Sequence, residues 1–216
     1  SPILFMLSSW TNPTYLRFPN HLGKAFLSAR PFPHLVLPDF FLRSKAEALV
    51  HALKREHWVL KDSDLFRFHQ TQDLRSSSGK MIREFYSFFS SRGLLEYISL
   101  LTNTPKTRPL QSIDAAGQTY ADGDYLLPHD DRLEGRKIAY VINLTKGFRR
   151  KDGGQLDFFA VDAKAGYRGH PTKVVKSFTP RFNTLFLFQV SKKSFHQVRE
   201  VISAKKRVSI GGWFHG

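Results

Sequence analysis

The chain has 216 residues, no cysteine and a formal net charge of +15, and hydrophobic residues make up 41% of it. This length fits one domain whose core can bury about 70% of the unfolded surface, and the twenty phenylalanines argue against a disordered chain. The lack of cysteine excludes disulfides, thiolate metal sites and a cysteine nucleophile, so any metal would need histidine and carboxylate ligands.

The positive charge favours nucleic acid, a ribosomal particle or another polyanion as surroundings over a small neutral metabolite. The basic residues are dispersed and form no continuous arm; they include residues 149–151 and 205–207 with Lys173, Lys176, Lys192 and Lys193. Direct binding of nucleic acid is therefore a secondary hypothesis. No apolar stretch approaches the ~18 residues that a membrane-spanning helix requires, which predicts a soluble protein without a membrane partner.

The first half of the chain has a helical pattern. An N-terminal extension is expected over residues 1–30 and one catalytic domain over residues 31–216. Prolines within residues 31–41 predict a strand that enters a turn, because they do not fit a helix interior. A helix is expected to begin at Ser44 as its N-cap, followed by helices over 81–91 and 94–101. These helices are expected to pack on the outside of a sheet.

The pattern changes after Pro109 to short apolar or alternating runs, which predict strands. These runs cover residues 138–144, 156–161, 173–178, 185–190 and 208–214. Many short strands after a helical beginning predict a mainly β fold with flanking helices, either a sandwich or a barrel.

Three dispersed side chains could hold a metal ion. His129 and Asp131 are two residues apart, so in an extended backbone both side chains leave the same face. His196 comes later, in a segment predicted to be a strand. Two imidazoles and one carboxylate can cap one face of a ferrous ion and leave three positions open. Taken singly, each residue is explained better by a solvated turn or by an ordinary strand histidine than by metal binding.

Arg207 adds an anion site to this set. The spacing from His196 allows a turn and a return strand, which predicts that the two residues lie on adjacent antiparallel strands. Arg207 shares a strand face with Ser209, and apolar neighbours such as Val208 and Ile210 mark the strand as core. A buried guanidinium beside a hydroxyl can hold a carboxylate. The four residues together predict an oxygenase that depends on Fe(II) and 2-oxoglutarate.

Most of the chain also resembles the ribosomal prolyl hydroxylases, a eukaryotic branch of these oxygenases. The matching segments follow in family order over residues 31–41, 61–68, 124–131, 153–159, 194–198 and 207–216. The resemblance implies a double-stranded β-helix, or jelly roll. It also implies His129, Asp131 and His196 as iron ligands, Arg207 as the anchor of the 2-oxoglutarate carboxylate, and Tyr120 as a tyrosine that supports this co-substrate.

One position departs from the family pattern. Asn143 stands where close relatives carry tyrosine; its amide can still bind a carboxylate, so Asn143 and Ser209 stay in the expected co-substrate pocket. Tyr125 and Trp213 are candidates to shape the groove for a prolyl ring, although core packing explains either residue better. Yeast and animal members carry a second, non-catalytic β-helix domain, which has no counterpart in these 216 residues.

The resemblance implies hydroxylation of a prolyl residue in the small-subunit ribosomal protein at the decoding centre. The reaction would use Fe(II), 2-oxoglutarate and O2, with ascorbate as an optional reductant, and would release succinate and CO2. A nuclear or cytoplasmic location is expected, with organelle targeting left open. The alternatives are a non-catalytic module that docks RNA or a ribosomal partner, and a nucleic-acid demethylase of the same superfamily. The hydroxylated carbon and the oligomeric state stay open.

Overall fold

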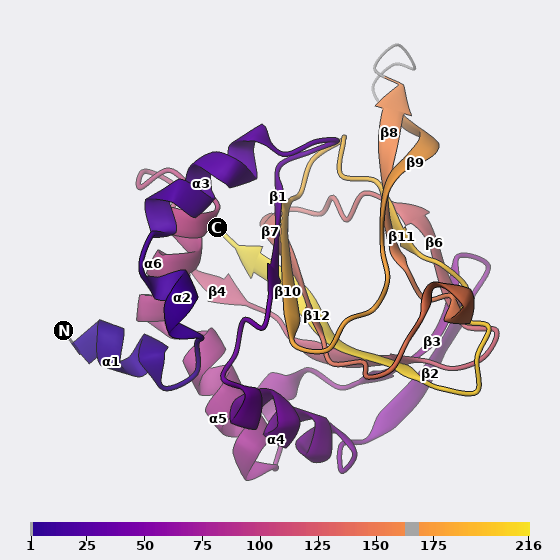
Figure 1. Cartoon of the computed structure of the whole chain (residues 1–216), viewed down its shortest axis with the longest axis horizontal. Coiled ribbons are helices and arrows are strands. Elements are labelled where there is room, and N and C mark those ends of the chain that lie inside the picture. Colours follow the sequence, from indigo (N-terminus) through magenta and orange to yellow (C-terminus); the bar gives the residue numbers. More distant parts are fainter. Residues whose placement is uncertain (1, 163–168) are drawn as a thin grey trace.

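The computed structural model describes residues 2–162 and 169–216. Figure 1 shows helices gathered beside a strongly curled sheet. The α-helices are α1 (Pro2–Ser8), α2 (Pro13–Leu16), α3 (Pro19–Ser28), α4 (Arg43–Leu53), α5 (Lys80–Phe89) and α6 (Arg92–Leu101), with 3-10 turns η1 (Leu74–Ser76) and η2 (Arg150–Asp152). Among the described residues, none of the helices has the length and hydropathy needed to cross a membrane.

The strands form one antiparallel sheet in the order β1-β10-β7-β12-β5-β3-β6-β11-β8-β9, with β2 added beside β3 and β4 beside β12. Their bounds are β1 His34–Pro38, β2 Trp58–Ser63, β3 Phe66–Thr71, β4 Ser112–Ile113, β5 Ala116–Tyr120, β6 Tyr125–His129, β7 Arg136–Asn143, β8 Leu156–Asp162, β9 His170–Phe178, β10 Thr184–Gln189, β11 His196–Val198 and β12 Arg207–His215. Strands distant in sequence are thus neighbours in the sheet.

The sheet curls until its two ends face each other. Phe158 of β8 packs in one cluster with Phe188 of β10 and Ala139 of β7, although β8 is remote from β7 and β10 in the strand order. Figure 1 shows β8 and β11 across from β10 and β12. This is the jelly roll with flanking helices, and the expected fold class is confirmed.

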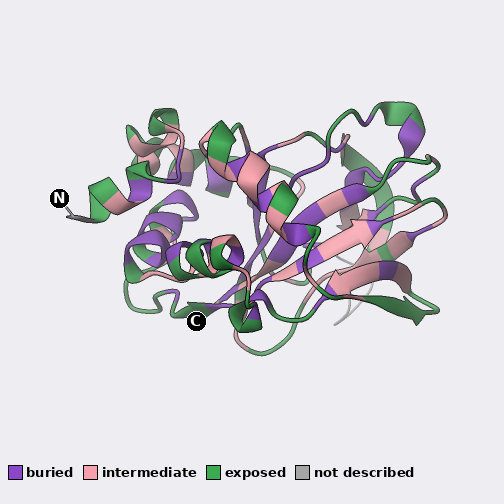
Figure 2. Ribbon diagram, turned by 90° about the horizontal axis from the view of Figure 1, so that it is seen from below, coloured by how far each residue is buried: buried purple, intermediate pink, exposed green. Residues whose placement is uncertain are grey.

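The main hydrophobic core lies between the helices and the outer face of this sheet. Phe85 and Phe89 of α5 are fully buried there and pack in one cluster with Phe214 of β12, and each such side chain contributes about 1.5–3 kcal/mol by leaving water. In Figure 2 the buried residues, coloured purple, lie along the helices and the strands. Trp10 and Phe26, from the expected extension, join the same core. The division at residue 31 stays a prediction.

Two local expectations need correction. Ser44 is not the N-cap of α4, because the helix already includes Arg43 and its N-cap is Leu42, which has no capping side-chain bond. A side-chain cap occurs instead at α6, where Ser91 Oγ accepts from the backbone N–H of Leu94 at 3.3 Å. The first three helices were not foreseen in the extension.

Candidate metal and co-substrate site

Two neighbouring strands bring the histidines together. His129 ends β6, and His196 begins β11 directly opposite it in the antiparallel register. The two ring centroids are 4.2 Å apart. Asp131 follows the end of β6 with a φ of 65°, in the left-handed region. The expectation of one extended strand through His129 and Asp131 is therefore wrong: a turn, which aspartate tolerates better than most residues, directs the carboxylate back to the imidazoles.

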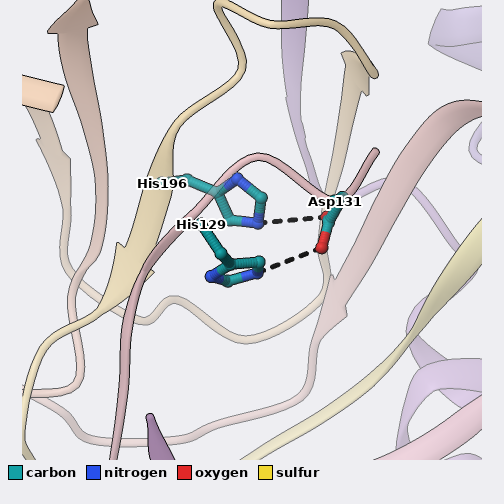
Figure 3. A group of neighbouring side chains, drawn as sticks. All are labelled: His129, Asp131 and His196. Carbon is teal, nitrogen blue, oxygen red and sulfur yellow. Dashed lines mark ion pairs between the residues drawn. The ribbon is translucent and has the colours of Figure 1, made fainter. Parts of the chain in front are cut away.

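The three side chains converge on one point. His129 Nε2 lies 3.0 Å from Asp131 Oδ1, and His196 Nε2 lies 3.2 Å from Asp131 Oδ2. Figure 3 shows both imidazoles turned toward the carboxylate. One ligand atom from each residue lies within 4.8 Å of the others. This spacing suits two nitrogens and one oxygen on the same divalent ion.

Backbone carbonyls fix which ring nitrogen faces the site. His129 Nδ1 lies 2.8 Å from the carbonyl oxygen of Leu127, and His196 Nδ1 lies 2.7 Å from that of Ser194. A carbonyl oxygen can only accept, so each Nδ1 carries the proton and donates. Both Nε2 atoms therefore face the metal position. A hydrogen bond from the other ring nitrogen to a carbonyl oxygen is the usual outer support of a ligating histidine.

Electrostatics keep the carboxylate ionised. Burial works to raise the pKa of Asp131, but the charge of His196 and hydrogen bonds from both imidazoles hold that pKa far below its usual range. For His129, burial lowers the pKa, but the hydrogen bond and charge of Asp131 outweigh burial and raise it. A metal that binds here must therefore displace the proton that His129 shares with Asp131.

Arg207 reaches this cluster from the opposite wall. Strand β11 pairs with β6 and β8, whereas β12 pairs with β4, β5 and β7. The expectation that His196 and Arg207 lie on adjacent strands is wrong, because the chain between them crosses from one wall of the jelly roll to the other. Both residues nevertheless line one cavity of about 450 Å³ together with His129 and Asp131. They meet across this cavity.

Arg207 is a buried cation without a carboxylate partner in the part of the chain that the structure describes. The residue is 2% exposed, its Nε donates to the carbonyl oxygen of Gly154 at 2.9 Å, and a terminal nitrogen lies 3.4 Å from Ser209 Oγ. Burial lowers the pKa of Arg207. An uncompensated buried charge costs several kcal/mol. The site therefore calls for an anion.

Tyr120 lies beside this guanidinium, and Asn143 lies on β7 next to the Arg207 strand. In the register, Tyr120 is opposite Arg207, and Asn143 is opposite Ser209. The Tyr120 ring centroid lies 5.3 Å from the guanidinium carbon, and its buried hydroxyl has no hydrogen-bond partner among the described residues. Burial raises the Tyr120 pKa, so the hydroxyl stays a neutral donor. The Asn143 carbonyl is already used, since it accepts from the Thr145 backbone N–H at 2.9 Å.

The two candidates for the prolyl groove differ in position. Trp213 lines the cavity, whereas Tyr125 is not among its lining residues and lies on β6 opposite Arg67. Sequence reasoning missed Arg136, whose guanidinium carbon lies 3.4 Å from the Trp213 ring centroid. Arg136 also donates to the backbone carbonyl of Asp131 at 3.2 Å. Arg136 thus links the cavity wall to a candidate metal ligand.

Replacing Arg136 by methionine is expected to weaken metal binding by about 10–100-fold, the usual cost of removing an outer partner of a ligand. The reason is that the left-handed turn at Asp131 loses the donor that holds its carbonyl. Titration with Mn(II) measures the effect. Arg132→Met is the matched control, since Arg132 pairs with Asp130 instead; equal affinities of the two variants would contradict the assigned role.

Comparisons with known proteins agree with this geometry. Residues 115–215 match the model of the 2OG-Fe(II) oxygenase superfamily. The chain carries a domain of this superfamily. It is 36% identical over 197 residues to the Xenopus laevis protein named prolyl 3-hydroxylase OGFOD1, covering 90% of this chain and 37% of that protein. It is 32% identical over 222 residues to the Ostreococcus tauri prolyl 3,4-dihydroxylase OGFOD1, covering 94% and 41%. The chain thus spans about two fifths of the length of these relatives.

The fold has a clear structural neighbour. A prolyl hydroxylase from Trichoplax adhaerens, solved with a peptide fragment of the hypoxia inducible factor oxygen degradation domain, superposes with a TM-score of 0.70 at 14% identity. The match covers 94% of this chain and 93% of that one. At this identity the likeness shows the jelly-roll fold alone.

The superfamily implies Fe(II), 2-oxoglutarate and O2, and the residues present fit the first two. The donor set of two imidazoles and one carboxylate is that of non-haem iron oxygenases. The unpaired guanidinium of Arg207 and the free hydroxyl of Tyr120 suit the far carboxylate of 2-oxoglutarate. Arg207 lines the same cavity as the metal cluster, and the Tyr120 ring lies beside its guanidinium, so both ligands would be close enough to meet.

Proposed function

We propose that this chain is the catalytic domain of a 2-oxoglutarate-dependent prolyl hydroxylase that acts on a small-subunit ribosomal protein. The observation that carries the proposal is that one cavity contains both the His129–Asp131–His196 cluster and a buried arginine, Arg207, which pairs with no carboxylate in residues 2–162 and 169–216. The names of the relatives support a prolyl residue as the substrate.

Each set of residues has a distinct task in this proposal. Bound iron with 2-oxoglutarate supplies the oxidising chemistry, in which O2 is consumed, the co-substrate loses CO2 to become succinate, and proline gains oxygen. His129, Asp131 and His196 hold the metal, and Arg207 with Tyr120 orients the co-substrate. Apolar lining residues such as Leu156, Phe188 and Val198 keep water away. Trp213 is the residue we assign to the prolyl ring.

The charge inside the cavity supports a basic substrate. Apart from the residues assigned to metal and co-substrate, the charged side chains that line the cavity are Asp73 and Asp114. They are acidic although the chain as a whole has a net charge of +15. A prolyl segment flanked by lysine or arginine, as ribosomal proteins offer, would meet favourable charge there. We place the enzyme near ribosomal particles, in the nucleus or cytoplasm, where its basic surface would contact RNA.

Mass spectrometry of a prolyl peptide from the decoding-centre protein tests this function. Incubation with Fe(II), 2-oxoglutarate and O2 is expected to add oxygen to proline and to release an equal amount of succinate. The His129→Ala variant should do neither. A peptide whose flanking basic residues are replaced by glutamate should react more slowly. No oxygen on the peptide, with turnover of methylated oligonucleotides instead, would reject prolyl hydroxylation in favour of a nucleic-acid demethylase.

A further inference from the structure

A second cavity, of about 530 Å³, lies at the end of α4. This back-face cavity is lined by the end of α4 and its C-cap Lys54, by Trp58, by Thr119 and Ala121 on either side of Tyr120, and by Lys206 and Val208 on either side of Arg207. Its volume lies within the range of about 300–1,000 Å³ that is usual for small-molecule sites. None of the lining residues belongs to the candidate active site.

Strand alternation places the back-face cavity on the other side of the sheet. Arg207 lines the active-site cavity, so its neighbours Lys206 and Val208 point to the opposite face. Thr119 and Ala121 likewise flank Tyr120, whose ring lies beside the Arg207 guanidinium. A ligand in the back-face cavity would therefore leave access to the metal cluster unchanged.

Trp58 provides a fixed aromatic wall. Its Nε1 donates to the carbonyl oxygen of Leu53 at 3.1 Å. The ring packs closely over Gly117, where an added Cβ would lie 2.9 Å from an indole carbon. The glycine thus lets the indole lie against the sheet, and the hydrogen bond holds its orientation. Because the Trp58 side chain is already held in place, little conformational entropy is lost when a flat ring stacks on it.

Two lysines give the cavity its charge. Lys54 and Lys206 are exposed, and neither has an ion pair or a side-chain hydrogen bond in the described part of the chain. At the negative end of α4, the Leu53 carbonyl already accepts from Trp58 Nε1 and from the Glu56 backbone N–H. Both ammonium groups remain free to bind phosphate.

The positive surface continues beyond the cavity. Lys205, next to Lys206, donates to the carbonyl oxygen of Gly147 at 2.7 Å and lies 3.6 Å from Asp152 at the end of η2. This contact brings the loop before β12 beside the exposed basic side chains of η2, Arg150 and Lys151. A chain of phosphates that leaves the cavity in this direction would meet further cations.

We propose that the back-face cavity binds a nucleotide of single-stranded nucleic acid, with the base stacked on Trp58 and a phosphate held by Lys54 and Lys206. An aromatic platform beside unpaired cations is the combination that single-stranded nucleic acids require. The inference deepens the RNA contact within the proposed function. It does not depend on which residue the active site oxidises.

Fluorescence anisotropy of a short labelled single-stranded RNA, over a series of salt concentrations, tests the proposal on the whole chain. Lys54→Ala/Lys206→Ala is expected to weaken binding by about tenfold and to reduce the slope of log K against log salt by about 0.7, the contribution of the one phosphate contact that is lost. Trp58→Leu is expected to weaken binding about fivefold or more through lost stacking. Lys24→Ala/Lys106→Ala removes the same charge from the helical side and should change little.

Further measurements separate the outcomes. Mn(II) binding and thermal unfolding of each variant establish that the fold and the metal site are intact. A mononucleotide that binds as tightly as the RNA, and loses affinity in the lysine variant, would support the site with a free nucleotide as its occupant. Wild-type chain that fails to bind either probe at low salt, or lysine variants that bind like the control, would overturn the proposal. Prolyl hydroxylation by all variants is expected to persist.

Discussion

The Asp131→Asn variant is expected to lose metal binding, with an affinity for Mn(II) that falls by more than the ~10–100-fold cost of changing an outer partner. Asp131 is the residue that both imidazoles face, at 3.0 and 3.2 Å. The amide removes the negative charge that attracts the cation but keeps the size of the side chain. Calorimetric titration measures the loss, and turnover of 2-oxoglutarate should disappear with it.

The neighbouring residue provides a matched control for this experiment. Asp130 pairs with Arg132 at 2.7 Å and does not belong to the metal cluster. Asp130→Asn makes the same chemical change one residue away and should keep both metal binding and turnover. If Asp131→Asn binds Mn(II) as tightly as Asp130→Asn does, the cluster is not the metal site.

The second large effect concerns the co-substrate. Arg207→Met is expected to weaken 2-oxoglutarate binding by at least about 30-fold, because truncating one partner of a buried charge pair costs roughly 2–5 kcal/mol. Without 2-oxoglutarate the variant should unfold at the same or a higher temperature than the wild type, since an unpaired buried cation has been removed. Loss of binding without loss of stability would identify an anion site and exclude a purely structural role.

Lys206→Met is the control for Arg207→Met. It removes a positive charge from the next residue, whose side chain lines the cavity on the opposite face of the sheet. Its 2-oxoglutarate affinity should match that of the wild type, and both variants should bind Mn(II) normally. A 2-oxoglutarate affinity for Arg207→Met equal to that of Lys206→Met would show that the co-substrate binds elsewhere.

Several strands after residue 138 were predictable because their apolar runs are short and are separated by glycine and proline, whereas β2 and β3 were missed because residues 61–68 were expected to form a loop. Residues 138–144 and 208–214 were expected as strands and correspond to β7, which ends at Asn143, and to β12; these two strands pair with each other inside the sheet. The pairing itself was not predictable from spacing. His196 and Arg207 are close in sequence, which suggested a hairpin, but the jelly roll places them on facing walls.

Some features of the site carry no signal in a single sequence. The residues Leu127, Ser194 and Gly154 contribute only backbone carbonyls, which any residue could offer. The left-handed turn at Asp131 was missed because an H-x-D spacing fits an extended strand equally well. Arg136 had one weak signal, a basic residue at the start of an apolar core strand. Only the fold shows that it reaches the Asp131 carbonyl.

Equilibrium binding of 2-oxoglutarate, measured anaerobically with and without Fe(II), tests most directly whether the metal cluster and Arg207 act as one site. We predict that 2-oxoglutarate binds tightly only when Fe(II) is present, and that both Asp131→Asn and Arg207→Met abolish this metal-dependent binding. The reason is that the cavity lined by these residues holds the metal and the anion anchor together. Binding of 2-oxoglutarate that is indifferent to Fe(II), or that survives in both variants, would contradict the site.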